Sequence, residues 1–333
     1  MGKKKIYMVL DSETATLPFA DEIAQGDAER KKRIAIAKPL IYDVGWTLCG
    51  RDGAIIDRKQ FLIAETFSVM AVFNTAYYKD KRPIYLEMLG RGETVIKPWN
   101  EVMEIFISDL NKVDAVGAFN SMFDFKKAIP FTELYISKVY SPDFYQWEEI
   151  QYRLCEKIAN GEKMPKNKDF NPDIFSFRGR DYPLFDLWGL STAHLLNNAT
   201  YKKACLDNGL LTESGTFFKT SAESTYKYLM DKFDFIESHT ALDDAEIESY
   251  ILHKIAQRHA ITQGIMYFPF QTLGFTYDFC QRLKKPNLKD CRVVYEKIES
   301  YIRAKEEQGI SNTYINRLYK ILTQLADYMG ISQ

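Results

Sequence analysis

A continuous apolar run, residues 6–10 (Ile-Tyr-Met-Val-Leu), ends abruptly at Asp11 near the start of this 333-residue chain. An unbroken apolar run of this length is typical of a β-strand that is buried on both faces. The run therefore predicts a central strand of a sheet covered by helices, with an acidic side chain where the apolar pattern stops.

Further segments alternate between strand and helix patterns along the chain. They are β-rich runs over 41–49 and 54–63, a helix over 98–111, a buried strand over 113–119 and a helix over 241–258. Residues 50–53 (GRDG) join the two β-rich runs and predict a hairpin turn. This order predicts an α/β fold, in which a mixed β-sheet is flanked by helices.

Three short polar clusters accompany these elements: residues 11–14 (DSET), 120–124 (NSMFD) and 239–244 (HTALDD). A phosphodiester is negatively charged and repels an attacking hydroxide, so enzymes that cleave one commonly hold two divalent cations with carboxylates. Four carboxylates from three distant segments, with a histidine beside the last, would supply both that clamp and a general base.

Asp244 shares a helical stripe with Ile247 and Ile251 at spacings i, i+3 and i+7, so it should face the core. A carboxylate on an inward stripe is costly unless a cation neutralises it. The alternative is an ordinary first-turn acid favoured by the helix dipole. The neighbouring Asp243 points about 100° away around the helix and is expected to be solvated.

Composition excludes several classes of protein. Hydrophobic content of 46% and aromatic content of 14% can fill a core, which excludes a disordered chain. The net charge of -1 excludes a strongly basic nucleic-acid binder but not a nuclease with an acidic site. Five scattered cysteines without a CxxC pair predict neither disulfides nor a zinc site. The short apolar N-terminal run fits no signal peptide or membrane span, so a cytoplasmic location is expected.

The joint occurrence of the three clusters resembles the DEDDh branch of the DnaQ-like 3′→5′ exonucleases, which have a ribonuclease H-like fold. The family motifs are DxET, an Asn followed four residues later by Asp, and HxAxxD. The matching residues are Asp11, Glu13 and Thr14; Asn120, Phe123 and Asp124; and His239, Ala241 and Asp244. The resemblance covers roughly residues 5–258.

The resemblance implies roles for individual residues. Asp11, Glu13, Asp124 and Asp244 would hold two Mg²⁺ or Mn²⁺ ions, and His239 would take the proton of the attacking water. Substrate-binding roles would fall to four residues around the 3′-terminal nucleotide: Thr14, Leu17 as an apolar wedge, Asn120 and Phe123.

The chain departs from compact family members in its loops. Thr16 occupies the place of the usual glycine after DxET, and the motifs are separated by insertions near 15–40 and 140–182. We expect an exonuclease domain over 1–260 and an α-helical accessory extension over 261–333, with two amphipathic helices. The 140–182 insertion mixes aromatic and basic residues, which could stack the bases of an upstream strand or fold over the sheet edge.

The sequence therefore predicts a metal-dependent 3′→5′ exonuclease that acts on single-stranded nucleic acid and releases nucleoside 5′-monophosphates. DNA is favoured over RNA, with a role in replication or proofreading and a DNA polymerase or other replication protein as partner. An exoribonuclease is one alternative. A non-catalytic exonuclease-fold module that binds a replication protein is another.

Two further polar features have less specific interpretations. Asp186 is expected to cap the N-terminus of a helix. The basic run Arg30-Lys31-Lys32-Arg33 is either a solvated face or a phosphate contact.

Overall fold

The computed structural model describes residues 4–162, 171, 173–195, 198–212, 218–257, 261, 288–307 and 313–331. The chain forms two compact units: Met1–Leu187 with Phe235–Gly264, and Trp188–Asp234 with Ile265–Gln333. Contacts thus group residues 188–234 with the C-terminal segment. The sequence predicts a boundary at residue 260 between an exonuclease domain and an accessory extension, and this boundary stays a prediction.

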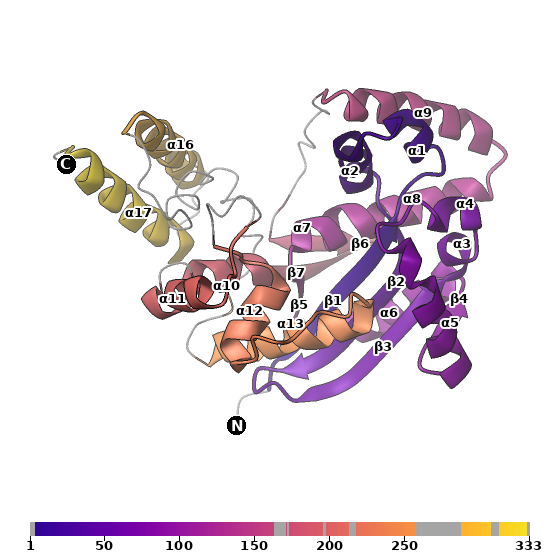
Figure 1. Ribbon diagram of the computed structural model, residues 1–333, viewed down its shortest axis with the longest axis horizontal. Helices are drawn as coiled ribbons and strands as arrows, with labels where there is room; N and C mark the ends of the chain where they lie inside the picture. The colour runs from indigo at the N-terminus through magenta and orange to yellow at the C-terminus, as the bar shows by residue number, and fades with distance from the viewer. Residues whose placement is uncertain are drawn as a thin grey trace. The chain divides into compact units, whose positions relative to one another are not determined.

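A seven-stranded mixed sheet organises the first unit, in the order β4-β3-β2-β1-β5-β7-β6 (Figure 1). The strands are β1 (Ile6–Ala15), β2 (Leu40–Gly50), β3 (Ile55–Ile63), β4 (Val95–Lys97), β5 (Ala115–Ala118), β6 (Ile174–Phe177) and β7 (Arg180–Asp186). β1, β5 and β7 run parallel, as do β3 and β4. β2 is antiparallel to both its neighbours, and β6 is antiparallel to β7. The predicted α/β class is confirmed.

β1 is longer than the apolar run predicts. Its pairing with β2 continues to Ala15, which lies opposite Leu40, with a register shift between Glu13 and Thr14. Asp11 and Glu13 therefore lie inside the strand and not after it. Hydrogen bonding to β2 extends the strand past the point where the side chains become acidic.

The first unit contains helices that contact the sheet and helices that contact one another. They are α1 (Ala20–Ala24), α2 (Ala28–Ala37), α3 (Ala64–Phe67), α4 (Met70–Phe73), α5 (Arg82–Arg91), α6 (Trp99–Leu110), α7 (Ser121–Phe123), α8 (Ile129–Val139), α9 (Phe144–Ala159) and α13 (Ala241–Ala256). A 3₁₀ turn, η1 (Lys79–Lys81), precedes α5, and a π-helical segment, η2 (Asp124–Ala128), links α7 to α8.

Neighbouring residues of β2 show that helices cover both faces, because successive side chains of a strand point to opposite sides. Gly45 faces α13: a Cβ on Gly45 would lie 2.4 Å from the backbone nitrogen of Leu242. Trp46 faces α6, where its Nε1–H donates to Asp109 at 3.0 Å. Figure 1 shows α13 lying along the β1–β3 part of the sheet.

Three residues of β2 hold α13 in this position, and we call them the β2–α13 seam: Asp43, Gly45 and Thr47. The backbone N–H of Ala241, at the start of α13, donates to Asp43 Oδ2 at 3.0 Å. The Thr47 hydroxyl lies 2.5 Å from that of Ser249, two turns further along the helix. The seam fixes both the distance of α13 from the sheet and the position of α13 along β2.

Half of the described aromatic residues of the 140–182 insertion are buried. Trp147, Phe175, Phe177 and Tyr182 are 1–8% exposed, whereas Tyr145 is 82% exposed. Phe175 and Phe177 belong to the hairpin that extends the sheet edge, which supports the folding alternative over base stacking for these rings. Other members of the mixture lie outside the described residues: Lys163, Lys166, Lys168 and Phe170.

The second unit contains α10 (Leu187–Leu195), which begins at the boundary, and α11 (Ala199–Asp207), α12 (Ala222–Met230), α16 (Leu288–Glu307) and α17 (Thr313–Met329). The predicted apolar stripes of α16 and α17 pack against each other in one cluster of buried residues. These are Ile298, Ile302, Ile315, Leu318, Leu322 and Leu325. Among the described residues, no helix is both long enough and apolar enough to cross a membrane.

We predict that Gly45→Ala destabilises the protein, because the new Cβ cannot fit against the backbone of Leu242. Overpacking of this kind typically costs about 1–3 kcal/mol, measurable by urea unfolding. Gly90→Ala is the matched control, since its Cβ would meet nothing within 4 Å and it lies within α5. That change should stabilise by roughly 0.5–1 kcal/mol. Equal stability of Gly45→Ala and wild type would contradict the close packing of α13 against Gly45.

Candidate metal and active site

Asp11 and Glu13 are two residues apart on β1, so strand alternation points both toward the same face. β2 lies antiparallel beside them, with Gly45 opposite Asp11 and Asp43 opposite Glu13. Glu13 is 9% exposed. The first motif therefore places two carboxylates on the central strand, on a face that is mostly shielded from water.

Asp124 reaches the same region from the segment after β5. Asn120 has a left-handed backbone (φ 91°), which turns the chain from β5 into α7. Asp124 is the first residue of the π-helical segment η2, and such segments are frequent at functional sites. The Ser12 hydroxyl donates to Asp124 Oδ1 at 2.6 Å, which joins the second motif to β1.

Asp244 comes from the first turn of α13. It is 5% exposed, and Ile247 and Ile251 of the same stripe are 7% and 1% exposed. The predicted inward stripe is thus confirmed. Among the described residues, Asp244 Oδ1 has no hydrogen-bond partner. Asp243 is exposed and accepts hydrogen bonds from the hydroxyls of Ser238 and Thr240, both at 2.9 Å.

Burial, followed by repulsion among these acids, raises the pKa values of the carboxyl groups in the site. Burial, and then the charges of Glu248, Asp244, Asp124 and Glu13, hold the pKa of Asp11 well above its ordinary range. A carboxylate that is desolvated beside other carboxylates favours its neutral form. Each of the three motifs therefore contributes charge to one cluster.

The remaining carboxylates of the cluster behave in the same way. Burial raises the pKa of Asp124 to about 7, although the Ser12 hydrogen bond acts in the opposite direction. Burial and the charge of Glu237 raise the pKa of Asp244 to about 8, while Lys81 lowers it. The pKa of Glu13 is likewise held well above its ordinary value by burial and by Asp244.

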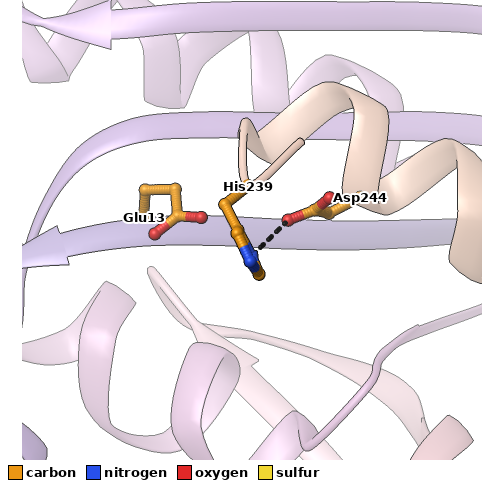
Figure 2. A group of neighbouring side chains, drawn as sticks. All are labelled: Glu13, His239 and Asp244. Carbon is orange, nitrogen blue, oxygen red and sulfur yellow. Dashed lines mark ion pairs between the residues drawn. The ribbon is translucent and has the colours of Figure 1, made fainter. Parts of the chain in front are cut away.

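Glu13, His239 and Asp244 form a group that could hold a metal ion, because one ligand atom from each lies within 4.8 Å of the others. Figure 2 shows their side chains converging from β1, the loop before α13 and α13 itself. His239 Nδ1 lies 3.9 Å from Asp244 Oδ2 and 3.6 Å from Glu237 Oε2. The geometry thus places His239 beside the acids, where its imidazole could either bind a metal ion or act as the predicted general base.

The four predicted substrate-binding residues lie on the same two segments. Thr14, Asn120 and Phe123 are half-buried. Leu17 is only 1% exposed, so in this conformation its side chain packs in the core and presents no wedge to a ligand. A base could stack there only after Leu17 moves.

Thr16, in place of the family's glycine, is fully buried and held at both ends. Its N–H donates to Thr75 Oγ1 at 2.8 Å, and its hydroxyl donates to the carbonyl of Lys38 at 2.8 Å. This double anchoring draws the chain after the first motif inward, which explains why Leu17 is covered.

Neither the family model search nor the searches of curated proteins and solved structures finds a match to this chain. The residues themselves therefore carry the functional argument.

Sequence reasoning missed Glu248. It is 2% exposed, its Oε2 accepts the N–H of Phe119 at 2.9 Å, and its charge is the largest electrostatic cause of the raised Asp11 pKa. A signal was present, because Glu248 lies four residues after Asp244 and so on the same helix face. Asp43 was also missed, since it caps α13 from a distant strand.

Two secondary expectations have different outcomes. Asp186 is fully buried at the end of β7, directly before α10, and its charge raises the Asp124 pKa. It therefore borders the acidic cluster. The basic run 30–33 lies on α2, where Arg33 donates to the carbonyl of Ala159 at 3.0 Å and Lys31 pairs with Asp21. These two contacts support a packing role for that helix.

We predict that, without divalent cations, stability falls as pH rises from about 4 to about 8. The unfolded acids ionise near 3.8, whereas Asp124 and Asp244 ionise near 7 and 8 in the fold, so the folded state binds more protons within this window. Mg²⁺ should therefore raise the melting temperature more at pH 8 than at pH 5. Differential scanning calorimetry with EDTA or Mg²⁺ measures both effects.

Asp244→Asn should flatten this pH dependence, because it removes one of the repelling charges. The exposed Glu104→Gln, in α6, is the control and should leave the profile unchanged. A wild-type profile that rises toward pH 8 in EDTA would contradict the prediction.

Proposed function

We propose that the protein is a metal-dependent 3′→5′ exonuclease. The observation that carries the proposal is the convergence of the three motifs: Asp11, Glu13, Asp124 and Asp244 repel one another in one buried cluster, with His239 at its edge. The strand order is β3-β2-β1-β5-β7, with β2 antiparallel to the rest. This order supports a ribonuclease H-like sheet as the fold that carries the three motifs.

The residues fit divalent cations on physical grounds. Buried acids of like charge raise one another's pKa, and Asp244 Oδ1 has no partner among the described residues. Carboxylate oxygens are the ligands that Mg²⁺ and Mn²⁺ favour. Two such ions would offset the charge of the phosphodiester and assist deprotonation of the attacking water.

The chain's own residues would complete the reaction. Asp11, Glu13, Asp124 and Asp244 hold the cations, and His239 accepts the proton of the attacking water at an imidazole nitrogen. Asn120, four residues before Asp124, and Phe123, directly before it, would contact the terminal nucleotide. The proton acceptor and the acids come from different segments, so correct folding of the sheet and α13 is needed before any activity appears.

Asp124→Asn should abolish nuclease activity while leaving the protein folded, because it removes a cation ligand and relieves repulsion. His239→Ala should lower turnover by about 10²–10⁴-fold, the usual effect of removing a positioned base. Hydrolysis of an end-labelled oligonucleotide measures activity, and calorimetric titration with Mn²⁺ measures metal affinity. Retained affinity in His239→Ala supports the base role, whereas lost affinity makes His239 a ligand.

His253→Gln is the matched control for His239→Ala, since His253 lies near the opposite end of α13 and contacts the Arg51 carbonyl at 3.2 Å. Its turnover should equal that of wild type. Full activity of Asp124→Asn, or of wild type in excess EDTA, would refute the proposed chemistry.

We also predict polarity and strand preference. A single strand with a free 3′-hydroxyl should be shortened from that end, with 5′-monophosphates as products. Blunt duplex should react more slowly, since unpairing the end costs a few kcal/mol. A 3′-phosphate should block digestion, and DNA should be preferred over RNA of the same sequence. Internal cleavage of a circular single strand would show an endonuclease, and faster digestion of RNA would show an exoribonuclease.

A further inference from the structure

An aromatic ring and a lysine from a distant segment contact His239 and the residue before it. Tyr78 stacks on the imidazole of His239, with ring centroids 4.5 Å apart and an interplanar angle of 15°. Lys81, in η1, donates to the carbonyl of Ser238. Its Nζ also lies 4.7 Å from the centroid of Tyr78. None of the three sequence motifs contains either residue.

His239 needs external support in this position. Its backbone is left-handed (φ 52°), a conformation that side chains other than glycine adopt at a cost. Its side chain is 32% exposed, so the protein encloses the ring only in part. On the helix side, the Ser238 and Thr240 hydroxyls bind Asp243. The stacked Tyr78 ring supports the imidazole itself.

Lys81 has a second, electrostatic effect. Its charge lowers the pKa of both Glu13 and Asp244, so it lies close to the acids that flank His239. A cation over an aromatic face is itself attracted by the negative face of the ring. Lys81 thus joins the Tyr78 ring, the backbone before His239 and the acidic cluster.

We propose that Tyr78 and Lys81 are positioning residues for His239, which hold its imidazole in the orientation that proton transfer requires. This inference rests on the proposed nuclease function and deepens it. A catalytic group must be held close to its productive geometry, and a displacement of about 1 Å can lower a rate about 10²-fold. Neither residue itself exchanges a proton with the substrate.

The test uses conservative and disruptive variants of each residue. Tyr78→Phe keeps the stacked ring and should retain wild-type kcat, whereas Tyr78→Leu should lower kcat by about 10²-fold with little change in KM. Lys81→Met should lower kcat in the same way. Tyr140, 73% exposed, and the exposed Lys79 provide matched controls. Tyr140→Leu and Lys79→Met should leave kcat unchanged.

A double-mutant cycle separates positioning from a general structural role. If Tyr78 acts through His239, Tyr78→Leu should have no further effect on kcat when His239 is already alanine. An equal loss of kcat in both backgrounds would overturn the inference. So would an equal loss of activity in Tyr78→Phe and Tyr78→Leu.

An NMR measurement provides a readout independent of activity. With ¹³C-labelled histidine, the ring protons of His239, assigned by loss of their signal in His239→Ala, should be shifted upfield by the stacked Tyr78 ring. Tyr78→Phe should retain that shift, and Tyr78→Leu should remove it. If the wild-type protein is an active nuclease but the His239 ring protons show no upfield shift, the positioning inference is overturned and the proposed function is not. An inactive wild-type protein with the shift refutes the proposed function and leaves the positioning of His239 established.

Discussion

The first turn of α13 lies so close to β2 that a single Cβ atom on Gly45 would forbid the contact. This approach brings Asp244 over the acids of β1, and the loop before the helix brings His239 with it. Asp43 holds the helix end by accepting the N–H of Ala241. A shift of α13 by one residue's width would separate the third motif from the first, so the site depends on this contact before any ligand binds.

The cluster is costly to the fold. Glu13, Asp124 and Glu248 are buried acids and Asp11 is half-buried. The pKa values of all four are raised. Sites that bind charged ligands commonly have this property, because the groups arranged for binding are not those that would stabilise the chain best. On the proposed function, bound cations offset the repulsion, so that stability and activity share the same requirement for metal.

Much of the site was predictable because its motifs follow periodic patterns. The strand that begins at Ile6 and the inward stripe carrying Asp244 were both predicted from local spacing and are confirmed. Pairing with β2, which local spacing does not show, carries that strand past Asp11 to Ala15. Tyr78 and Lys81 were not predictable, since they reach His239 from a short segment with no periodic pattern. The resemblance implied that Leu17 is an apolar wedge against the terminal base, yet the hydrogen bonds of Thr16 to distant residues draw Leu17 into the core. Contacts between segments far apart in sequence decide these cases.

The N-terminus of α13 shows why the fold alone cannot stabilise these acids. Asp43, Asp243 and Asp244 all lie at the positive end of the helix dipole, which stabilises a nearby carboxylate by about 0.3–1 kcal/mol. The pKa of Asp244 is nevertheless raised from 3.8 to about 8, and each pKa unit corresponds to about 1.4 kcal/mol. Burial and repulsion therefore outweigh the dipole. Lys81 opposes them but leaves the pKa high. On the proposed function, bound divalent cations would supply the further positive charge that keeps Asp244 ionised at neutral pH.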